Sequence, residues 1–335
     1  MKVLGFANRN SGCGFHRVIM PLAMMQDVQA CICVVPRAEV IQEGFDVLLY
    51  NRQSVWDNNW KKIKNELGIK IVMDLDDGWV LPYSHAMFET YWDLREKIEN
   101  NIRYADLVTC TNERLADKIR PFNTNVTIIP NGIPFGYQQY HQERRDNERV
   151  RIFWAGGDSH ERDLKILSNP IKRLIPQSKK ILMVLAGYVE NETWKGMFRD
   201  FTGGGRLPYK KYHGTEPNQY MIAYEDADIM VIPLEETEWH SCKSNLKLLE
   251  AACKKLAVVV SRVEPYSLDS DAPVLWVDKQ TDWFEHLNFL INNEQARKEL
   301  GERLYEWAKA KYNLTEINER RRTIFESLIE APALL

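Results

Sequence analysis

The stretch between residues 227 and 266 constrains the fold more than any other part of the sequence, because it follows the pattern strand, loop, helix, strand. Residues 229–232 and 258–260 are apolar runs of strand length, and apolar residues recur at helical spacing from residue 244 to residue 253. Two buried strands joined by a helix favour a parallel α/β sheet.

The helix of this stretch begins just past the carboxyl end of a strand. Its first N–H groups have no partner within the helix and its dipole is positive there, so the helix start is a ready anion site. Lys243 and Lys247 add positive charge beside it, and Glu250 is placed two turns along to accept hydrogen bonds from a ribose diol. An ordinary amphipathic helix with surface lysines is the plainer alternative.

Length and composition narrow the class of protein. The 335 residues suffice for two domains of ordinary size, and a net charge of -3 gives no general attraction to nucleic acid or acidic membranes. The sequence has no apolar run long enough for a membrane span or a signal peptide, and its six cysteines lack metal or redox spacing. We therefore expect a cytoplasmic protein with reduced thiols.

Strands alternate with helices in both halves of the chain, which predicts a parallel sheet in each half, and the polar residues 137–149 predict a solvated linker between them. The first half has predicted strands at residues 2–7, 30–35, 47–50, 69–75, 106–110 and 126–129, and helices at 56–67 and 87–104. The second half has predicted strands at residues 150–154, 181–186, 229–232, 258–260 and 274–277, and helices at 281–292, 294–312 and 314–329. Aromatic residues between 194 and 201 suggest a lid or capping helix.

Acidic side chains gather where one predicted strand ends. Asp74, Asp76 and Asp77 lie at the end of the strand at residues 69–75. Ligands of open α/β sheets bind outside the carboxyl ends of the strands, so we expect these acids to face a cleft or its rim. A helix cap with solvated acids is the alternative. His85, in the loop that follows, is a candidate general base or ligand contact.

Two loops of small residues each join a strand to a helix, an arrangement typical of phosphate sites. The first contains Gly12, Gly14 and Arg17, and the second contains Gly156, Gly157 and His160. A tight turn would by itself explain Gly14, and His160 would equally suit a helix cap.

Five separated segments resemble, in order, the motifs of GT-B glycosyltransferases of the group-1, family-4-like type found in bacteria and phages. They are residues 12–21 (GCGFHRVIMP), 74–79 (DLDDGW), 130–133 (PNGI), 154–164 (WAGGDSHERDL) and 243–250 (KSNLKLLE). The chain departs from the pattern at Cys242, where the wider superfamily often has an acid, and at residues 255–256, where a glycine is usual. The nearby residues Glu235, Glu236 and Glu238 are possible substitutes for that acid.

The resemblance implies an α/β protein with two Rossmann-like domains facing across a cleft, which is the GT-B fold. It implies an acceptor-side domain at residues 1–136, a nucleotide-sugar-binding domain at residues 150–313, and a last helix within residues 314–335 that crosses back to the first domain. The implied activity is transfer of a sugar from a nucleoside diphosphate sugar to a hydroxyl group, with retention of anomeric configuration. The nucleotide sugar is a co-substrate, and no cofactor or metal is expected.

The resemblance also carries roles onto matching residues. Catalytic roles are expected for Asp76, Asp77 and Lys247, with Asp76 or Asp77 orienting the acceptor hydroxyl or stabilising positive charge at the sugar carbon. His85 lies outside the matching motifs, and a catalytic role is expected for it from its place in the loop after the strand. Donor binding is expected from Gly12, Gly14, Arg17, Gly156, Gly157, His160, His213, Lys243, Ser244, Asn245, Leu246 and Glu250. The nucleotide base is expected near Tyr212, His213 and Thr215.

The acceptor stays open between two partners. Bacterial members of the family mostly build surface polysaccharide, which implies a glycan, whereas related phage enzymes glycosylate hydroxymethylated bases in DNA. Two alternatives come from other classes, namely an isomerase of the nucleotide-sugar 2-epimerase type and a non-catalytic nucleotide-sugar binder. Cys242 in place of an acid slightly favours the non-catalytic alternative.

Overall fold

The computed structural model describes residues 1–7, 11–33, 40, 43–52, 60–83, 85, 87–143, 145 and 147–330. The chain divides into two compact units. Unit 1 comprises Met1–Gly132, Ser241–Ser244 and Tyr312–Leu335, and unit 2 comprises Ile133–His240 and Asn245–Lys311.

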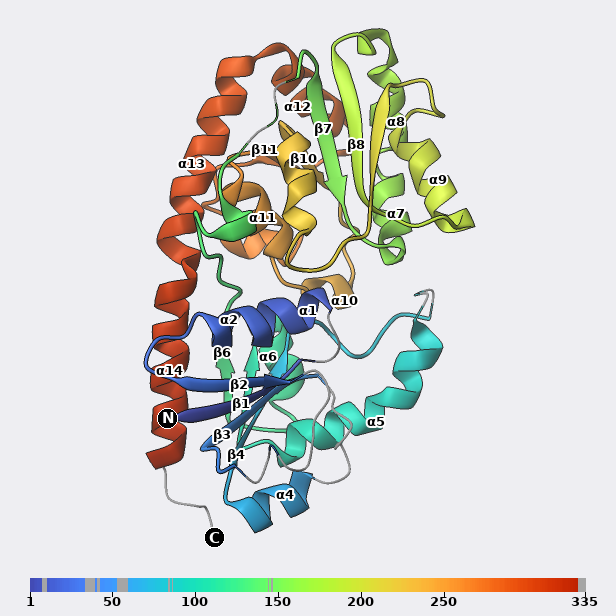
Figure 1. The fold of residues 1–335 in the computed structure, drawn as a ribbon. Helices are drawn as coiled ribbons and strands as arrows, with labels where there is room; N and C mark the ends of the chain where they lie inside the picture. Colours follow the sequence, from blue (N-terminus) through green and yellow to red (C-terminus); the bar gives the residue numbers. More distant parts are fainter. Residues whose placement is uncertain are drawn as a thin grey trace. The chain divides into compact units, whose positions relative to one another are not determined.

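Unit 1 is built on a six-stranded parallel sheet with the order β2-β1-β3-β4-β5-β6 (Figure 1). The order reverses between β1 and β3, which is the topological switch point of a doubly wound sheet. The strands are β1 Lys2–Phe6, β2 Gln29–Cys33, β3 Val47–Asn51, β4 Lys70–Leu75, β5 Leu107–Cys110 and β6 Val126–Ile128. The helices are α1 Gly12–Gly14, the π-helix η1 Phe15–Ile19, α2 Met20–Ala23, α4 Trp60–Leu67, α5 Phe88–Tyr104, α6 Glu113–Ile119 and α14 Leu314–Glu330.

Both faces of this sheet are covered, so its central strands are apolar throughout. All five residues of β3 are buried, with Leu48 and Tyr50 in one core cluster and Val47 and Leu49 in the other. Helix α5 covers the first face, and Phe325 of α14 packs into the second. The last helix of the chain therefore completes the core of unit 1.

Unit 2 contains a second six-stranded parallel sheet, with the order β12-β11-β10-β7-β8-β9. Its switch point lies between β7 and β10, as in the dinucleotide-binding sheet. The strands are β7 Val150–Ala155, β8 Ile181–Tyr188, β9 Tyr209–His213, β10 Ile229–Ile232, β11 Ala257–Ser261 and β12 Leu275–Val277. The main helices are η3 Asp158–His160, α7 Glu161–Lys165, α8 Ser168–Arg173, α9 Glu192–Phe201, η5 Tyr220–Asp226, α10 Glu238–Ser241, α11 Leu246–Cys253, α12 Gln280–Asn292 and α13 Glu294–Tyr312.

Three expectations differ from the structure. Trp194 and Phe201 of α9 are buried in the core of unit 2, so this helix is a packed element and no lid. Tyr140 is buried within the expected solvated linker, where Gln138–Tyr140 forms the short helix η2. Strand β9 was not expected, because its sequence YKKYH contains no aliphatic residue. Residues 34–35 of one predicted strand and 56–59 of one predicted helix lie outside the described residues.

Within the described part of the chain, no helix is both long and apolar enough to cross a bilayer.

Candidate functional site

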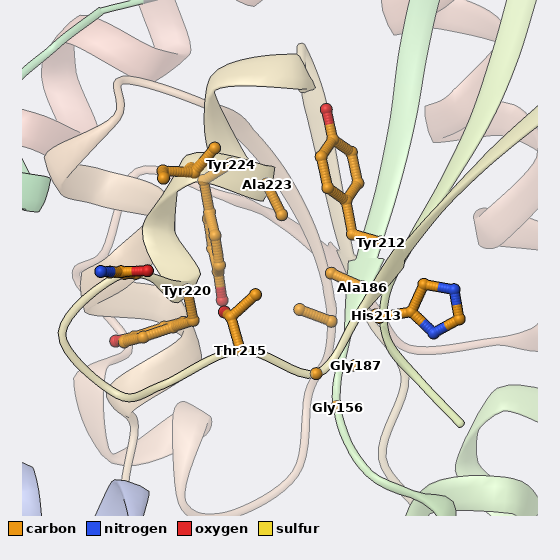
Figure 2. A pocket seen from close by; sticks show the side chains of 13 residues that line it. Gly156, Ala186, Gly187, Tyr212, His213, Thr215, Tyr220, Ala223 and Tyr224 are labelled. Atoms are coloured by element: carbon orange, nitrogen blue, oxygen red, sulfur yellow. The ribbon is translucent and has the colours of Figure 1, made fainter.

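A pocket of about 290 Å³ opens in unit 2 at the carboxyl ends of β7, β8 and β9. Helix η5 closes another wall, so that Tyr220 and Tyr224 lie on one side of the pocket and Tyr212 and His213 on the other (Figure 2). Small-molecule sites of parallel sheets lie at this edge, and pockets for such ligands start at roughly 300 Å³.

Two glycines let the ends of β7 and β8 approach each other at the pocket. Gly187 has a φ of +95°, and a Cβ on it would lie 2.2 Å from the backbone oxygen of Gly156. A Cβ on Gly156 would lie 2.8 Å from the Trp154 ring and 3.2 Å from the Nζ of Lys247. Both positions therefore require glycine, and the lysine ammonium lies beside the bare backbone of Gly156.

Glu250 lies under this pocket and is almost completely buried. The hydroxyls of Tyr220 and Tyr224 donate to its two carboxylate oxygens, Tyr220 at 2.5 Å. Burial raises the pKa of Glu250 above its ordinary value, although these hydrogen bonds and the charge of Lys247 act in the opposite direction. Tyr220 and Tyr224 are among the residues that line the pocket, and Glu250 is not.

Helix α11 begins at Leu246, and Asn245 occupies the N-cap position. The Asn245 side chain makes no capping hydrogen bond to the helix. The Asn245 amide instead donates to Asp269 at 2.6 Å. The Nζ of Lys247, in the first turn, lies 5.5 Å from the centroid of the Trp154 ring. Ser244 and Lys243 precede the helix and belong to unit 1.

The loop after β7 is organised by a buried carboxylate. Asp163 accepts a hydrogen bond from Nδ1 of His160 at 2.7 Å and from the backbone N–H of Glu235 at 2.8 Å, and Nε2 of His240 lies 3.7 Å away. Burial favours the neutral acid, but the hydrogen bond and the two histidines hold the pKa of Asp163 below its ordinary value. A carboxylate only accepts, so the His160 ring presents its Nδ1–H to Asp163. Gly157 precedes η3 with a φ that any residue adopts.

In unit 1, Asp76 is the centre of a polar cluster at the carboxyl ends of β3 and β4. Arg52 donates to Asp76 at 3.1 Å and Asn51 donates at 3.3 Å. Burial alone would raise the pKa of Asp76, but Arg52 and the hydrogen bonds from Cys13 and Asn51 hold it below its ordinary value. Arg52 itself has a φ of +61°. A non-glycine residue held in this region costs about 1–2 kcal/mol and is frequent at functional sites.

Asp77 lies beside this cluster and contacts the segment before α11. Lys243 approaches the carboxylate of Asp77 at 3.3 Å, and Asn112 donates to the backbone oxygen of Lys243 at 2.6 Å. Cys242 is buried in the apolar core of unit 1. The side chain at the position of the missing acid therefore packs against apolar residues.

Arg17 is a structural ion-pair partner. Its guanidinium is 1% exposed and makes two hydrogen bonds of 2.8 Å to Asp74. It also donates to the side chain of Asn131 at 3.0 Å, and a Cβ on Gly132 would lie 2.8 Å from the Cα of Leu314. Asn131 and Gly132 of the motif at residues 130–133 are therefore required by contacts within unit 1. The buried contacts of Arg17 favour a positioning role for it over contact with a ligand.

The remaining predicted residues of unit 1 are Gly12, Gly14 and His85. Gly12 and Gly14 form the short helix α1, where Ser11 accepts from the N–H of Gly14 at 3.1 Å, and neither glycine has a positive φ. The Nδ1 of His85 accepts from the backbone N–H of Met87 at 3.1 Å, just before α5.

The structure thus brings the predicted residues together in two groups. In unit 2, Gly156 and His213 line the pocket, and Lys247 and Glu250 lie next to the lining residues Gly156 and Tyr220. In unit 1, Asp77 and Lys243 lie beside the cluster around Asp76. Sequence analysis missed Arg52 and the tyrosines at positions 220 and 224. The two tyrosines are four residues apart just before the strand at residues 229–232, and this spacing could have indicated that they share one face of a helix.

A metal site would need several convergent ligands. In the described ranges, only His141, Glu143 and Glu225 place three potential ligand atoms close together. Arg145 and Lys254 lie 3.7 Å from the Glu225 carboxylate, so this group is part of an ion-pair network.

No protein-family profile matches the chain, and no curated protein matches it by sequence. Solved structures do match. HepE from Anabaena in complex with UDP aligns over 98% of this chain and 100% of its own, with 14% identity and a TM-score of 0.68. TarM aligns over 83% of this chain with 15% identity and a TM-score of 0.61, and this chain spans 54% of its length. The fold is GT-B.

The GT-B fold is common to proteins of different activity. HepE has also been solved with UDP and glucose and with UDP-glucose. A putative UDP-N-acetylglucosamine 2-epimerase from Listeria monocytogenes aligns over 98% of this chain and 96% of its own, with 8% identity and a TM-score of 0.60. Function must therefore be argued from the site.

Proposed function

We propose that this protein is a glycosyltransferase that moves a sugar from a nucleoside diphosphate sugar to a hydroxyl acceptor. The observation that carries the proposal is the unit 2 pocket, with the bare backbone of Gly156 and the ammonium of Lys247 beside it. HepE, which shares the fold along its whole length, binds UDP and UDP-glucose, so we propose a uridine diphosphate donor.

The nucleoside would enter the pocket between η5 and the end of β9. Tyr220 would meet the ribose, with Glu250 fixing its hydroxyl, and His213 and Thr215 would lie near the base. The diphosphate would lie against Gly156 and Gly157, near Lys247 and the first N–H groups of α11, at Asn245 and Leu246. Such preorganised donors stabilise the charge that develops on the leaving diphosphate. His160, oriented by Asp163, and Ser244 are further candidates for this role.

In the proposed reaction the bond between the sugar C1 and the diphosphate oxygen breaks, and a bond forms between C1 and the acceptor oxygen. The acceptor proton passes to the leaving diphosphate, and the anomeric configuration is retained. Asp76 stays ionised because its pKa is lowered, so it accepts a hydrogen bond from the acceptor hydroxyl or stabilises positive charge at C1. Asp77 and Lys243 would shape the same acceptor side.

A glycan is the acceptor that the charges of unit 1 support better than DNA. Basic residues of unit 1 line a groove at the opposite, amino-terminal ends of β4, β5 and β6, namely Lys64, Lys70, Arg103 and Arg120. Two of them are paired, Lys64 with Asp106 at 2.6 Å and Arg120 with Glu113 and Asp117. The aspartates around Asp76 are each paired with a cation, so this cluster offers no excess positive charge to a phosphate backbone.

Calorimetric titration and thermal unfolding with a panel of nucleoside diphosphates test the donor site. Because a ligand that binds only the folded state raises its stability, we expect UDP at a hundredfold excess over Kd to add about 2.7 kcal/mol. Absence of binding by every nucleotide would remove the donor site. Incubation of UDP-sugars without acceptor then separates transfer from isomerisation, since an epimerised sugar would support the 2-epimerase alternative. Binding without hydrolysis, transfer or isomerisation would support a non-catalytic binder.

A further inference from the structure

We propose that three aromatic side chains of unit 1, Tyr83, Phe88 and Trp92, form a platform on which a neutral glycan chain binds as the acceptor. This inference rests on the proposed transferase function and specifies its acceptor. The three residues are called the aromatic platform below.

The aromatic platform is a contiguous surface. Phe88 and Trp92 are one helical turn apart on α5 with ring centroids 5.7 Å apart, and Tyr83 meets Phe88 edge-on at 5.1 Å. Tyr83 is 84% exposed and Trp92 is 63% exposed. Large aromatic rings bury substantial area when they gain a partner, so a cluster of exposed rings marks an interaction site. The apolar C–H face of a pyranose ring stacks on such rings.

The aromatic platform is connected to the Asp76 cluster through one helical turn. Tyr91 lies three residues after Phe88, about one turn along α5, and packs toward the core of unit 1. Arg52 donates to the Tyr91 hydroxyl and lies 5.6 Å from its ring centroid. Arg52 in turn donates to Asp76 at 3.1 Å. A chain of sugars stacked on the rings would therefore have an end near the carboxylate that is proposed to orient the acceptor hydroxyl.

Charge distinguishes a neutral glycan from other occupants. Asp76 and Asp77 at the end of β4 are paired with Arg52 and Lys243 and leave no excess positive charge there. On α5, the exposed residues Glu89 and Asp93 directly follow Phe88 and Trp92 in the sequence. Anionic lipids and nucleic acids carry phosphates that these carboxylates repel. Carboxylates beside an aromatic ring instead accept hydrogen bonds from sugar hydroxyls, which are donors without charge.

The test uses the full chain and three variants, Trp92→Ala, Tyr83→Ala and Tyr104→Ala. Tyr104 is a matched control, because it is an exposed aromatic residue at the other end of α5. Electrophoresis through gels that contain dextran, laminarin or galactomannan measures binding to neutral glycans. We expect at least one glycan to retard the wild type, and the Trp92 and Tyr83 variants to lose about tenfold or more in affinity while Tyr104→Ala keeps it. UDP affinity should be the same in all four proteins.

Each outcome addresses a separate claim. A wild type that binds UDP but none of the glycans overturns the platform and leaves the donor site standing. A wild type that binds a glycan through the platform but binds no nucleotide overturns the transferase function instead. Two further assays test other partners. If the wild type pellets with phosphatidylglycerol vesicles and the Trp92 and Tyr83 variants do not, the platform binds lipid and the glycan proposal is wrong. If the wild type binds single-stranded DNA and these variants do not, the platform binds nucleic acid and the glycan proposal is also wrong. Equal losses in Tyr104→Ala would show that no specific surface exists.

Discussion

Arg17 and Arg52 each pair with an aspartate at the end of β4, but burial separates their roles. The guanidinium of Arg17 is 1% exposed and is engaged by Asp74 and two further acceptors, so it supports the fold. The Arg52 side chain is 13% exposed and holds Asp76 at the rim of the sheet. The same residue type therefore serves packing in one case and a candidate site in the other.

Lys247→Ala should weaken UDP binding by about 10- to 100-fold, because a hydrogen bond to a charged group contributes about 1.5–3 kcal/mol. Titration calorimetry measures the change. Lys298→Ala is the matched control, since Lys298 is an exposed lysine of unit 2 whose ammonium pairs with Glu294 one turn away on α13. Equal affinity of the Lys247 variant and the wild type would remove Lys247 from the donor site.

Glu250→Gln should change how stability depends on pH. Burial raises the pKa of Glu250 above its ordinary value of 4.5, so the folded chain binds this proton more tightly than the unfolded chain. The contribution of Glu250 to the free energy of unfolding therefore falls as pH rises above about 4.5, and it stays at its lowest above the folded pKa. Relative to the wild type, the glutamine variant should gain stability across this window. Denaturant unfolding from pH 4 to 8 measures the difference, and parallel curves would contradict the assignment.

At the scale of elements, the ends of β7 and β8 depend on glycine. Gly187→Ala should destabilise unit 2 by more than the strain of a positive φ alone, which is about 1–2 kcal/mol, because its Cβ would also overlap the backbone of Gly156. Gly204→Ala separates the two effects, since Gly204 has a φ of +77° and open space around it. Denaturant unfolding of both variants, with UDP titration of each, provides the comparison. Equal losses of stability would mean that the overlap relaxes at no cost.

The elements themselves were largely predictable because hydrophobic runs of strand length are unambiguous in a parallel sheet. Residues 229–232 and 294–312 were predicted with the bounds that β10 and α13 have. Strand β9 was not predicted because it lies at the edge of the sheet, and its sequence YKKYH has two adjacent lysines and no aliphatic residue. Helix α9 was misjudged because its aromatic side chains, which suggested a lid, face the core.

The sequence indicated a candidate site made of glycines and charged residues, but it did not indicate the hydrogen bonds that these residues make. Sequence patterns indicated Gly156, Lys247 and Glu250, whereas the partners of Glu250 come from a segment about 30 residues earlier in the chain. Arg17 shows the converse, because its motif suggested a ligand contact and its burial indicates an ion pair. Whether a charged residue forms a buried ion pair depends on residues that are distant in sequence and close in the fold. The spacing of residues along the chain does not reveal such partners.

At the scale of the whole molecule, the pocket proposed for the donor is lined by residues of unit 2. UDP should slow amide hydrogen exchange in peptides that cover residues 209–226 and 245–253, because binding stabilises the segments that contact the ligand. Peptides from β1 and β3 in unit 1 serve as the internal reference. Protection confined to unit 1 would contradict the assignment of the donor to the unit 2 pocket.

The division of the chain limits how such proteins exchange parts during evolution. Unit 1 takes its last helix, α14, from the far end of the chain, where Asn318 donates to the backbone oxygen of Pro21 and Phe325 fills the core. A single genetic crossover near the codon for Gly132 would join one parent's sheet to another parent's α14. A functional hybrid would need two crossovers, or two parents in which the face of the sheet and the last helix are already compatible. We therefore expect acceptor and donor specificities to be inherited together more often than they are exchanged separately.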